Sequence, residues 1–284
     1  MRILITGAAG MLGTDLWKAL GSEHELILTD VVGDFLALDV TDTQAVSDMV
    51  TGTKPEAVIH AAAFTNVDGC EVDPDAAFRV NAFGTWNVAS ACAANDVALL
   101  YVSTDFVFDG EKSEPYYEFD LPNPLSRYGA SKLAGEWYVR NLCHKHWIVR
   151  TAWLFGENGN SFPRTVIDIA RTGKPLRVVA DQVGSPTFTR DLSLKIEEIL
   201  TDSLYGTYHV TNKGACSWYE FARTALDLAG LGGVDIMPIK SDEWDSPTRR
   251  PKNSVLRHWA LEVQGMDDLR QWQDALADFV SRLG

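Results

Sequence analysis

A tyrosine and a lysine four positions apart could form a proton-transfer pair. Tyr128 and Lys132 lie in the run RYGASK, residues 127–132. In a helix this spacing is about one turn, so both side chains project from the same face. A lysine ammonium stabilises a nearby phenolate and lowers the tyrosine pKa from about 10, which favours proton exchange with a ketone or alcohol oxygen near neutral pH. The spacing also occurs on ordinary surface helices, so the rest of the chain must support this interpretation.

The beginning of the chain predicts a nucleotide-binding turn. An apolar strand, Arg2–Thr6, leads into Gly7, Gly10 and Gly13, and a helix is predicted over Gly10–Leu20. The glycines allow a tight turn, the approach of a pyrophosphate to the backbone, and close packing of helix on sheet. The helix N-terminus offers its free amides to the phosphates. The spacing G-x-x-G-x-x-G differs from the commoner G-x-G-x-x-G.

An acidic residue follows the second predicted strand and suits the adenosine ribose. This strand, Glu25–Thr29, ends at Asp30, a little under 20 positions after the glycines. Residues 31–34 contain no arginine or lysine that could bind a 2′-phosphate. The cofactor is therefore NADH or NADPH, with NADH favoured by Asp30. The alternative is a carboxylate that only caps a loop.

Short apolar runs alternate with helical patterns through the first half of the chain. Further strands are predicted at Ala57–His60, Ala98–Ser103 and Trp147–Thr151, with a short piece at Phe35–Leu38; the helices between them cover Thr43–Thr51, Asp75–Asn95 and Ser126–Leu142. This alternation predicts an α/β fold with a Rossmann-type, doubly wound parallel sheet. The dinucleotide-binding domain is predicted at 1–155, with a return segment near 187–212.

The remainder, 156–284, is predicted to form mainly a smaller substrate-binding lobe. Glycine and proline interrupt the pattern after Trp153, so few elements are assigned there: a strand at Tyr208–Thr211 and helices at Ser217–Leu228 and Leu269–Leu283. By the general rule for open α/β sheets, the active site lies at the carboxyl ends of the strands.

Composition narrows the classes of partner. The net charge of −14 argues against nucleic acid and anionic membranes. We expect no signal peptide, and no apolar run is long enough to span a bilayer. The four cysteines are scattered and the six histidines lack metal-ligand spacing, so we expect a cytoplasmic protein with reduced thiols and no metal site.

Two strand ends carry groups that suit a bound ketone. Small residues in Ala61–Thr65 would let a cofactor lie against the backbone. In the next strand end, the hydroxyls of Ser103 and Thr104 point to where a carbonyl would lie. Thr104 and Tyr128 could hold the ketone oxygen between two hydroxyls while a hydride arrives, without a metal.

Together these features resemble the extended short-chain dehydrogenase/reductases, and in particular the dTDP-4-dehydrorhamnose reductase family. The resemblance covers nearly the whole chain in order, in the runs STDFVFDG (103–110), AAAFTNVD (61–68), VNA (80–82), WLFG (153–156), DQVGSPT (181–187) and RPKNS (250–254). Phe64, Phe106 and Asn66 depart mildly from residues usual in the family.

The resemblance implies reduction of dTDP-4-dehydro-6-deoxy-L-mannose to dTDP-L-rhamnose, a step of polysaccharide biosynthesis. Tyr128 would donate the proton, Lys132 would bind the nicotinamide ribose, and Thr104 would orient the ketone. The cofactor would contact Gly7, Gly10, Met11, Leu12, Asp30, Asp39, Val40, Ala63, Phe64 and Thr65. The dTDP-sugar would contact Thr104, Asp105, Trp153 and Arg250, although Trp153 also fits a core aromatic.

An acidic protein that binds a diphosphate needs a local basic patch. Arg190, Arg249, Arg250 and Lys252 are candidates, and we expect some of them to face the diphosphate. For any single member, a solvated surface charge is an equal alternative. Some family members use Mg²⁺ at a dimer contact. A homodimer therefore stays open, but the spacing of Asp15 and Asp191 does not indicate a metal site.

Other reactions of the same branch fit less well. A dehydratase needs a second carboxylate after Asp105, where this chain has Phe106, and an epimerase usually carries Ser-Ser at this strand end. Another sugar-nucleotide reductase or epimerase remains an alternative. So does a non-catalytic subunit resembling the regulatory subunit of methionine adenosyltransferase, because fold alone does not prove turnover.

Overall fold

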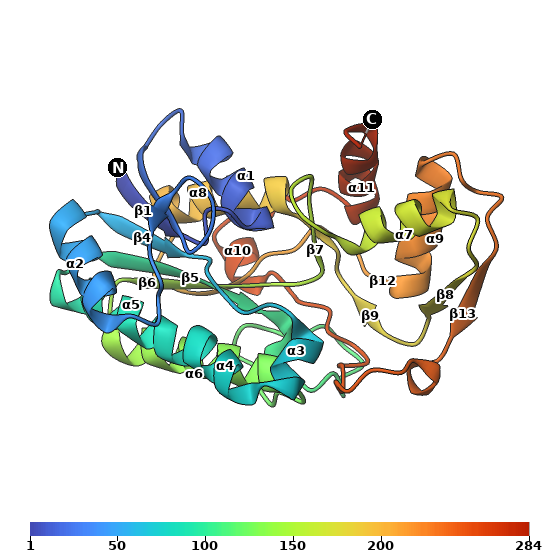
Figure 1. Ribbon diagram of the computed structural model, residues 1–284, viewed down its shortest axis with the longest axis horizontal. Coiled ribbons are helices and arrows are strands. Elements are labelled where there is room, and N and C mark those ends of the chain that lie inside the picture. Colours follow the sequence, from blue (N-terminus) through green and yellow to red (C-terminus); the bar gives the residue numbers. More distant parts are fainter. Residues whose placement is uncertain (284) are drawn as a thin grey trace.

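A seven-stranded parallel sheet forms the body of the protein, and a second lobe extends from one end of it (Figure 1). The structure is a computed structural model and describes residues 1–283. The strand order is β11-β6-β5-β4-β1-β2-β3. The strands are β1 (Arg2–Thr6), β2 (Glu25–Asp30), β3 (Leu36–Ala37), β4 (Ala57–His60), β5 (Ala98–Thr104), β6 (His146–Thr151) and β11 (Gly206–His209). The predicted Rossmann-type, doubly wound sheet is confirmed.

Helices cover both faces of the sheet, which explains why its central strands are continuous apolar runs. Every residue of β4 and β5 is buried. One face packs against α1 (Met11–Leu20), α8 (Thr189–Asp202) and α10 (Trp259–Val263); the other packs against α2 (Thr43–Thr53), α5 (Thr85–Ala94) and α6 (Arg127–Leu142). The carboxyl ends of the strands are thereby left open for ligands.

The helix predicted over Asp75–Asn95 is three elements. It begins as α4 (Pro74–Phe78), continues as the π-helix Arg79–Gly84, and ends as α5. The short α3 (Val67–Val72) precedes it. A π-helix is rare and has no signature among the residue types, so the helical pattern alone did not reveal it.

The second lobe has its own aromatic core. Its helices are α7 (Phe162–Arg171), α9 (Trp218–Leu228) and α11 (Trp272–Ser281), and its small sheets are the pairs β8 (Leu176–Val179) with β13 (Ile236–Ile239), β9 (Val183–Gly184) with β12 (Cys216–Ser217), and β7 (Leu154–Phe155) with β10 (Thr187–Phe188). Phe155, Phe188, Phe221 and Phe279 are fully buried at its centre. This lobe forms one wall of the ligand cavity described below.

The prediction of irregular structure after Trp153 is wrong for two segments, which form the helices α7 and α8. Helix α7 buries Val166, Ile167 and Ala170 on one face, and Pro163 occupies its first turn, where a missing N–H costs nothing. Helix α8 packs along α1 and leads into β11, which pairs in parallel with β6. That strand covers Gly206–His209 and so lies two residues before the predicted Tyr208–Thr211.

Within the described residues, no helix combines the length and the apolar character that crossing a membrane requires.

Candidate active site

The glycine turn after β1 is closely packed, and its glycines are required by space. Gly7 has a φ of +78°, and a Cβ there would lie 2.7 Å from the backbone nitrogen of Ala62. A Cβ on Gly13 would lie 2.0 Å from the carbonyl oxygen of Gly7. Helix α1 therefore approaches the turn closely, and its N-terminus faces the cavity.

Asp30 braces this turn from the end of β2. Its Oδ2 accepts a hydrogen bond from the backbone N–H of Ala9 at 2.9 Å, and its Oδ1 accepts one from Val32 at 3.1 Å. The carboxylate also lines the cavity. Each oxygen keeps a lone pair for a further donor, so Asp30 can hold the loop and still accept from a ribose hydroxyl.

The segment after β4 presents small side chains to the cavity. Ala61, Ala62, Ala63 and Thr65 line it, but Phe64 does not. The side chain of Asn81 binds the backbone of Phe64, accepting from its N–H at 2.7 Å and donating to its carbonyl at 3.0 Å. Of the predicted cofactor contacts, Phe64 is the one that lies outside the cavity lining.

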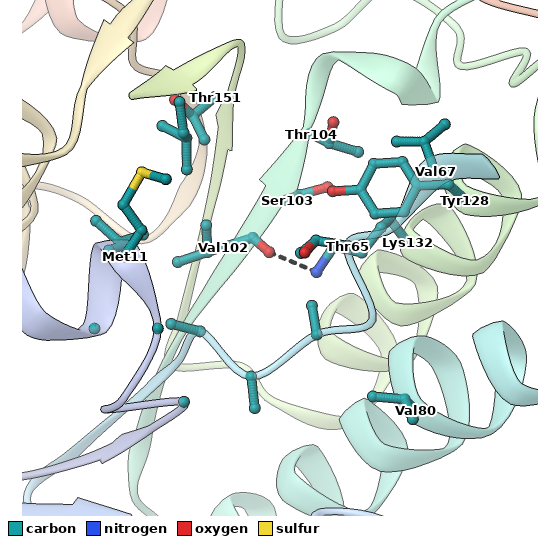
Figure 2. A pocket seen from close by; sticks show the side chains of 18 of the residues that line it. Met11, Thr65, Val67, Val80, Val102, Ser103, Thr104, Tyr128, Lys132 and Thr151 are labelled. Atoms are coloured by element: carbon teal, nitrogen blue, oxygen red, sulfur yellow. Dashed lines mark hydrogen bonds between the residues drawn. The ribbon is translucent and has the colours of Figure 1, made fainter. Parts of the chain in front are cut away.

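Tyr128 and Lys132 lie on the cavity side of α6, one turn apart (Figure 2). Ser126 caps the N-terminus of this helix, because its hydroxyl accepts from the N–H of Gly129. Gly129 is needed because a Cβ there would lie 2.1 Å from the carbonyl oxygen of Phe106. This close approach places the tyrosine ring beside the end of β5, where Thr104 is located.

Thr104 closes β5 and faces the same space as Tyr128 (Figure 2). Its hydroxyl donates to Asp105 Oδ1 at 3.0 Å and accepts from the N–H of Phe106 at 3.2 Å. Burial raises the pKa of Asp105 to about 6. Ser103 differs from expectation, because its hydroxyl donates to Glu136 and not toward a bound carbonyl.

The expected effect of Lys132 on the Tyr128 pKa does not occur in this geometry. The Lys132 ammonium donates to the carbonyl of Val102 at 2.8 Å and lies 4.2 Å from the ring centre of Tyr101. Burial raises the Tyr128 pKa well above its usual value, although the Thr104 hydroxyl opposes this. Burial also lowers the pKa of Lys132, to about 7. Tyr128 is therefore protonated and able to donate at neutral pH, whereas Lys132 changes its protonation state close to pH 7.

A single cavity of about 970 Å³ joins these groups. All predicted site residues except Phe64 line it: Gly7, Gly10, Met11, Leu12, Asp30, Asp39, Val40, Ala63, Thr65, Thr104, Asp105, Tyr128, Lys132, Trp153 and Arg250. It has the size of a small-molecule site. The cradle of glycines and alanines fits a dinucleotide, and the far end reaches the second lobe.

Trp153 and Arg250 form the wall on the side of the second lobe. Trp153 has a φ of +47° and stacks on Trp218 with 3.5 Å between ring centres. A Cβ on Gly184 would lie 2.4 Å from the Trp153 ring, so this glycine makes room for it. Arg250 forms an ion pair with Asp68, with 3.1 Å between Arg250 Nη2 and Asp68 Oδ1. Both residues thus point from fixed positions into the cavity.

Of the four candidate cations for a diphosphate, only Arg250 lines the cavity; Arg190, Arg249 and Lys252 do not. The lining residues that sequence reasoning missed include Arg79, Asn160 and Trp218. No spacing signal marks them, because they reach the site only through the folding of the second lobe and the π-turn. Among residues 1–283, no cluster of histidine, cysteine and carboxylate side chains could hold a metal ion.

A Rossmann-type sheet, a glycine turn under an open cavity, and the Thr104, Tyr128 and Lys132 set define a nicotinamide-dependent short-chain dehydrogenase/reductase. Comparison with known proteins narrows this class. The family model described as "RmlD substrate binding domain" matches residues 1–284. The chain therefore belongs to the dTDP-4-dehydrorhamnose reductase family, and the resemblance inferred from its motifs is confirmed.

Individual relatives agree with this placement over their full length. The chain is 37% identical to a dTDP-4-dehydrorhamnose reductase of Aggregatibacter actinomycetemcomitans, covering 97% of each chain. It is 36% identical to a dTDP-4-keto-6-deoxy-D-glucose reductase of Streptomyces niveus, covering 97% of this chain and 95% of that one. A crystal structure of dTDP-4-dehydrorhamnose reductase from Bacillus anthracis in complex with NADP superimposes with a TM-score of 0.95, at 40% identity and 99% coverage of both chains.

Proposed function

We propose that this protein is an NAD(P)H-dependent reductase that converts dTDP-4-dehydro-6-deoxy-L-mannose to dTDP-L-rhamnose. The observation that carries the proposal is the meeting of Thr104, Tyr128 and Lys132 in one cavity with the glycine turn. The motif order and the family membership of the chain support it. A purely regulatory subunit would need no such set of acid, orienting hydroxyl and ammonium.

The cofactor fits along the floor of the cavity. The amides of residues 10–12, at the N-terminus of α1, would bind the pyrophosphate, and Asp30 would accept from the adenosine ribose. Asp39 and Val40 would border the adenine, and Ala63 and Thr65 the middle of the molecule. When bound, the nicotinamide supplies the hydride that reduces the keto carbon.

Proton delivery falls to the chain's own hydroxyls. The buried Tyr128 hydroxyl is protonated at neutral pH and donates its proton to the oxygen of the former ketone. Thr104 would orient that oxygen. Its hydroxyl donates to Asp105 Oδ1 and accepts from the N–H of Phe106, so its hydrogen must turn from Asp105 toward the substrate oxygen. Lys132 would bind the nicotinamide ribose with its ammonium group. With Phe106 in place of a second carboxylate, the site has no acid–base pair for eliminating water.

The direct test is product identification by NMR. The purified protein is incubated with NADH and dTDP-4-dehydro-6-deoxy-L-mannose, and in parallel with dTDP-4-keto-6-deoxy-D-glucose, the substrate in the name of the Streptomyces niveus relative. We expect dTDP-L-rhamnose from the first reaction. If only the second sugar is reduced, the protein is still a reductase but its substrate is that sugar. If neither sugar leads to oxidation of NADH, the proposal is contradicted.

Arg250 is proposed to contact the diphosphate of the substrate. Replacing it with glutamate removes a cation that lines the cavity and repels the phosphates, so the KM for the dTDP-sugar should rise at least about tenfold. Arg249→Glu is the matched control, because Arg249 is exposed and outside the cavity lining. Equal KM values for the two variants would remove Arg250 from the site.

Asp30 is proposed to favour NADH over NADPH. Its negative charge would repel a 2′-phosphate, so Asp30→Asn should lower the ratio of kcat/KM for NADH to that for NADPH by about tenfold. Asparagine keeps an acceptor oxygen for the loop, which limits damage to the turn. The matched control is Asp34→Asn. Asp34 is exposed and does not line the cavity, so this variant should leave the ratio unaltered. An unchanged ratio in Asp30→Asn would contradict the proposal.

A further inference from the structure

A fully buried ion pair lies directly behind the proposed catalytic residues. Glu136 of α6 has 0% and Arg150 of β6 has 1% of its surface exposed. The pair is bidentate, with Arg150 Nε to Glu136 Oε1 at 2.8 Å and Arg150 Nη2 to Glu136 Oε2 at 2.7 Å. Burying two charges is costly, and such a pair is weak evidence for stability as its purpose. Its position suggests another role.

Glu136 is connected to both halves of the proton-delivery site. It lies one helical turn after Lys132 on α6, just as Lys132 lies one turn after Tyr128. On its other side, Glu136 Oε1 accepts from the Ser103 hydroxyl at 2.6 Å, and Ser103 immediately precedes Thr104. One carboxylate therefore joins the helix that carries the donor to the strand end that carries the orienting hydroxyl.

Glu136 is also the charge that favours the ammonium form of Lys132. Burial lowers the pKa of Lys132 to about 7, and the Glu136 carboxylate opposes that shift. The other groups around Lys132 do not help: His60 of β4 is neutral because burial lowers its pKa to about 3, and Tyr101 of β5 and Tyr128 are protonated phenols. Two arginines, Arg150 and the half-exposed Arg140, keep Glu136 ionised in turn.

We propose that Glu136 is a positioning residue for the reduction, which keeps Lys132 protonated in its buried position and aligns the end of β5 through Ser103. This inference rests on the proposed role of Lys132. Arg150 serves to keep the Glu136 carboxylate ionised and oriented. A purely structural ion pair would affect stability but would not affect the pH dependence of the reaction.

The test is the pH profile of kcat/KM for the dTDP-sugar at saturating NADH. Activity requires the Lys132 ammonium, so the profile falls as pH rises through the Lys132 pKa. Without the Glu136 charge the ammonium is less stable, and Glu136→Gln should move this alkaline limb to lower pH by about one unit. The control is Glu262→Gln, which also removes the carboxylate of an arginine ion pair, here with Arg257 at 2.7 Å. This variant should leave the alkaline limb in place.

Two further variants keep the test decisive. Glu136→Gln leaves Arg150 buried without its partner and could prevent folding. Glu136→Gln with Arg150→Met removes both charges and should retain the fold, and its limb should move in the same direction by a smaller amount, because the Arg150 cation no longer disfavours the Lys132 ammonium. Ser103→Ala breaks the link to β5 but keeps the carboxylate, so it should lower kcat severalfold while the limb stays in place.

Lys132→Met separates this inference from the proposed function. If that variant keeps its activity, Lys132 has no role in turnover and the proposed function loses its mechanism. If it is inactive while the folded Glu136→Gln/Arg150→Met variant has the wild-type alkaline limb, the role of Glu136 is overturned and the reductase stands. A shifted limb together with a native far-UV circular dichroism spectrum supports the inference.

Discussion

Replacing Tyr128 with phenylalanine lowers kcat for ketone reduction by about a thousandfold, the usual contribution of a positioned general acid. The ring still lines the cavity and still contacts Phe106 edge-on at 5.6 Å, so the packing around α6 is retained. Only the proton is lost. The Kd for NADH, measured by fluorescence titration, should stay within about twofold of the wild type, since the contacts to the pyrophosphate are unaffected.

The matched control is Tyr138→Phe. Tyr138 lies on the same helix, packs against Trp86 and Trp137, and does not line the cavity. This variant should reduce the ketone at the wild-type rate. Should Tyr128→Phe keep most of its activity, the proton would come from another group, and Asp105, whose pKa is about 6, would be the next candidate to replace.

Gly13→Ala should abolish cofactor binding at ordinary concentrations. The added Cβ would lie 2.0 Å from the carbonyl oxygen of Gly7, which is backbone and cannot rotate away. Helix α1 and the turn must separate, and overpacking of this kind costs about 3 kcal/mol or more of stability. The displaced amides would lose two hydrogen bonds to the pyrophosphate, which weakens NADH binding by at least about a hundredfold.

Gly52→Ala is the control for a glycine without such contacts. Gly52 lies near the end of α2, is exposed, and has nothing within 4 Å of an added Cβ. Alanine there should raise the free energy of unfolding by up to about 1 kcal/mol, because helical glycine is entropically costly. Thermal denaturation gives the stability of both variants. A Gly13→Ala protein with wild-type Tm and NADH affinity would show that the turn tolerates a side chain.

The cofactor half of the fold was readable from the sequence because its signals are local. The glycine spacing, the buried strands β1, β4 and β5, and the Tyr128–Lys132 pair each depend on residues close together in the chain. Parallel strands buried on both faces are continuous apolar runs, and helices between them are long enough to be recognised. In the second lobe the helices α9 and α11 were predicted, but the strands were not, because they are only two to four residues long and too short to show a periodic pattern.

The sequence by itself determined the class of fold, the order of the motifs and the identity of the reacting side chains, because each is specified by spacing within a turn or a strand. Only the tertiary structure decided how those side chains are surrounded. It placed Arg250 against Asp68, 182 positions away, brought Trp218 onto Trp153, and buried Lys132 next to Glu136. Burial raises the pKa of Tyr128 and lowers that of Lys132, and burial depends on packing between elements that are distant in the sequence.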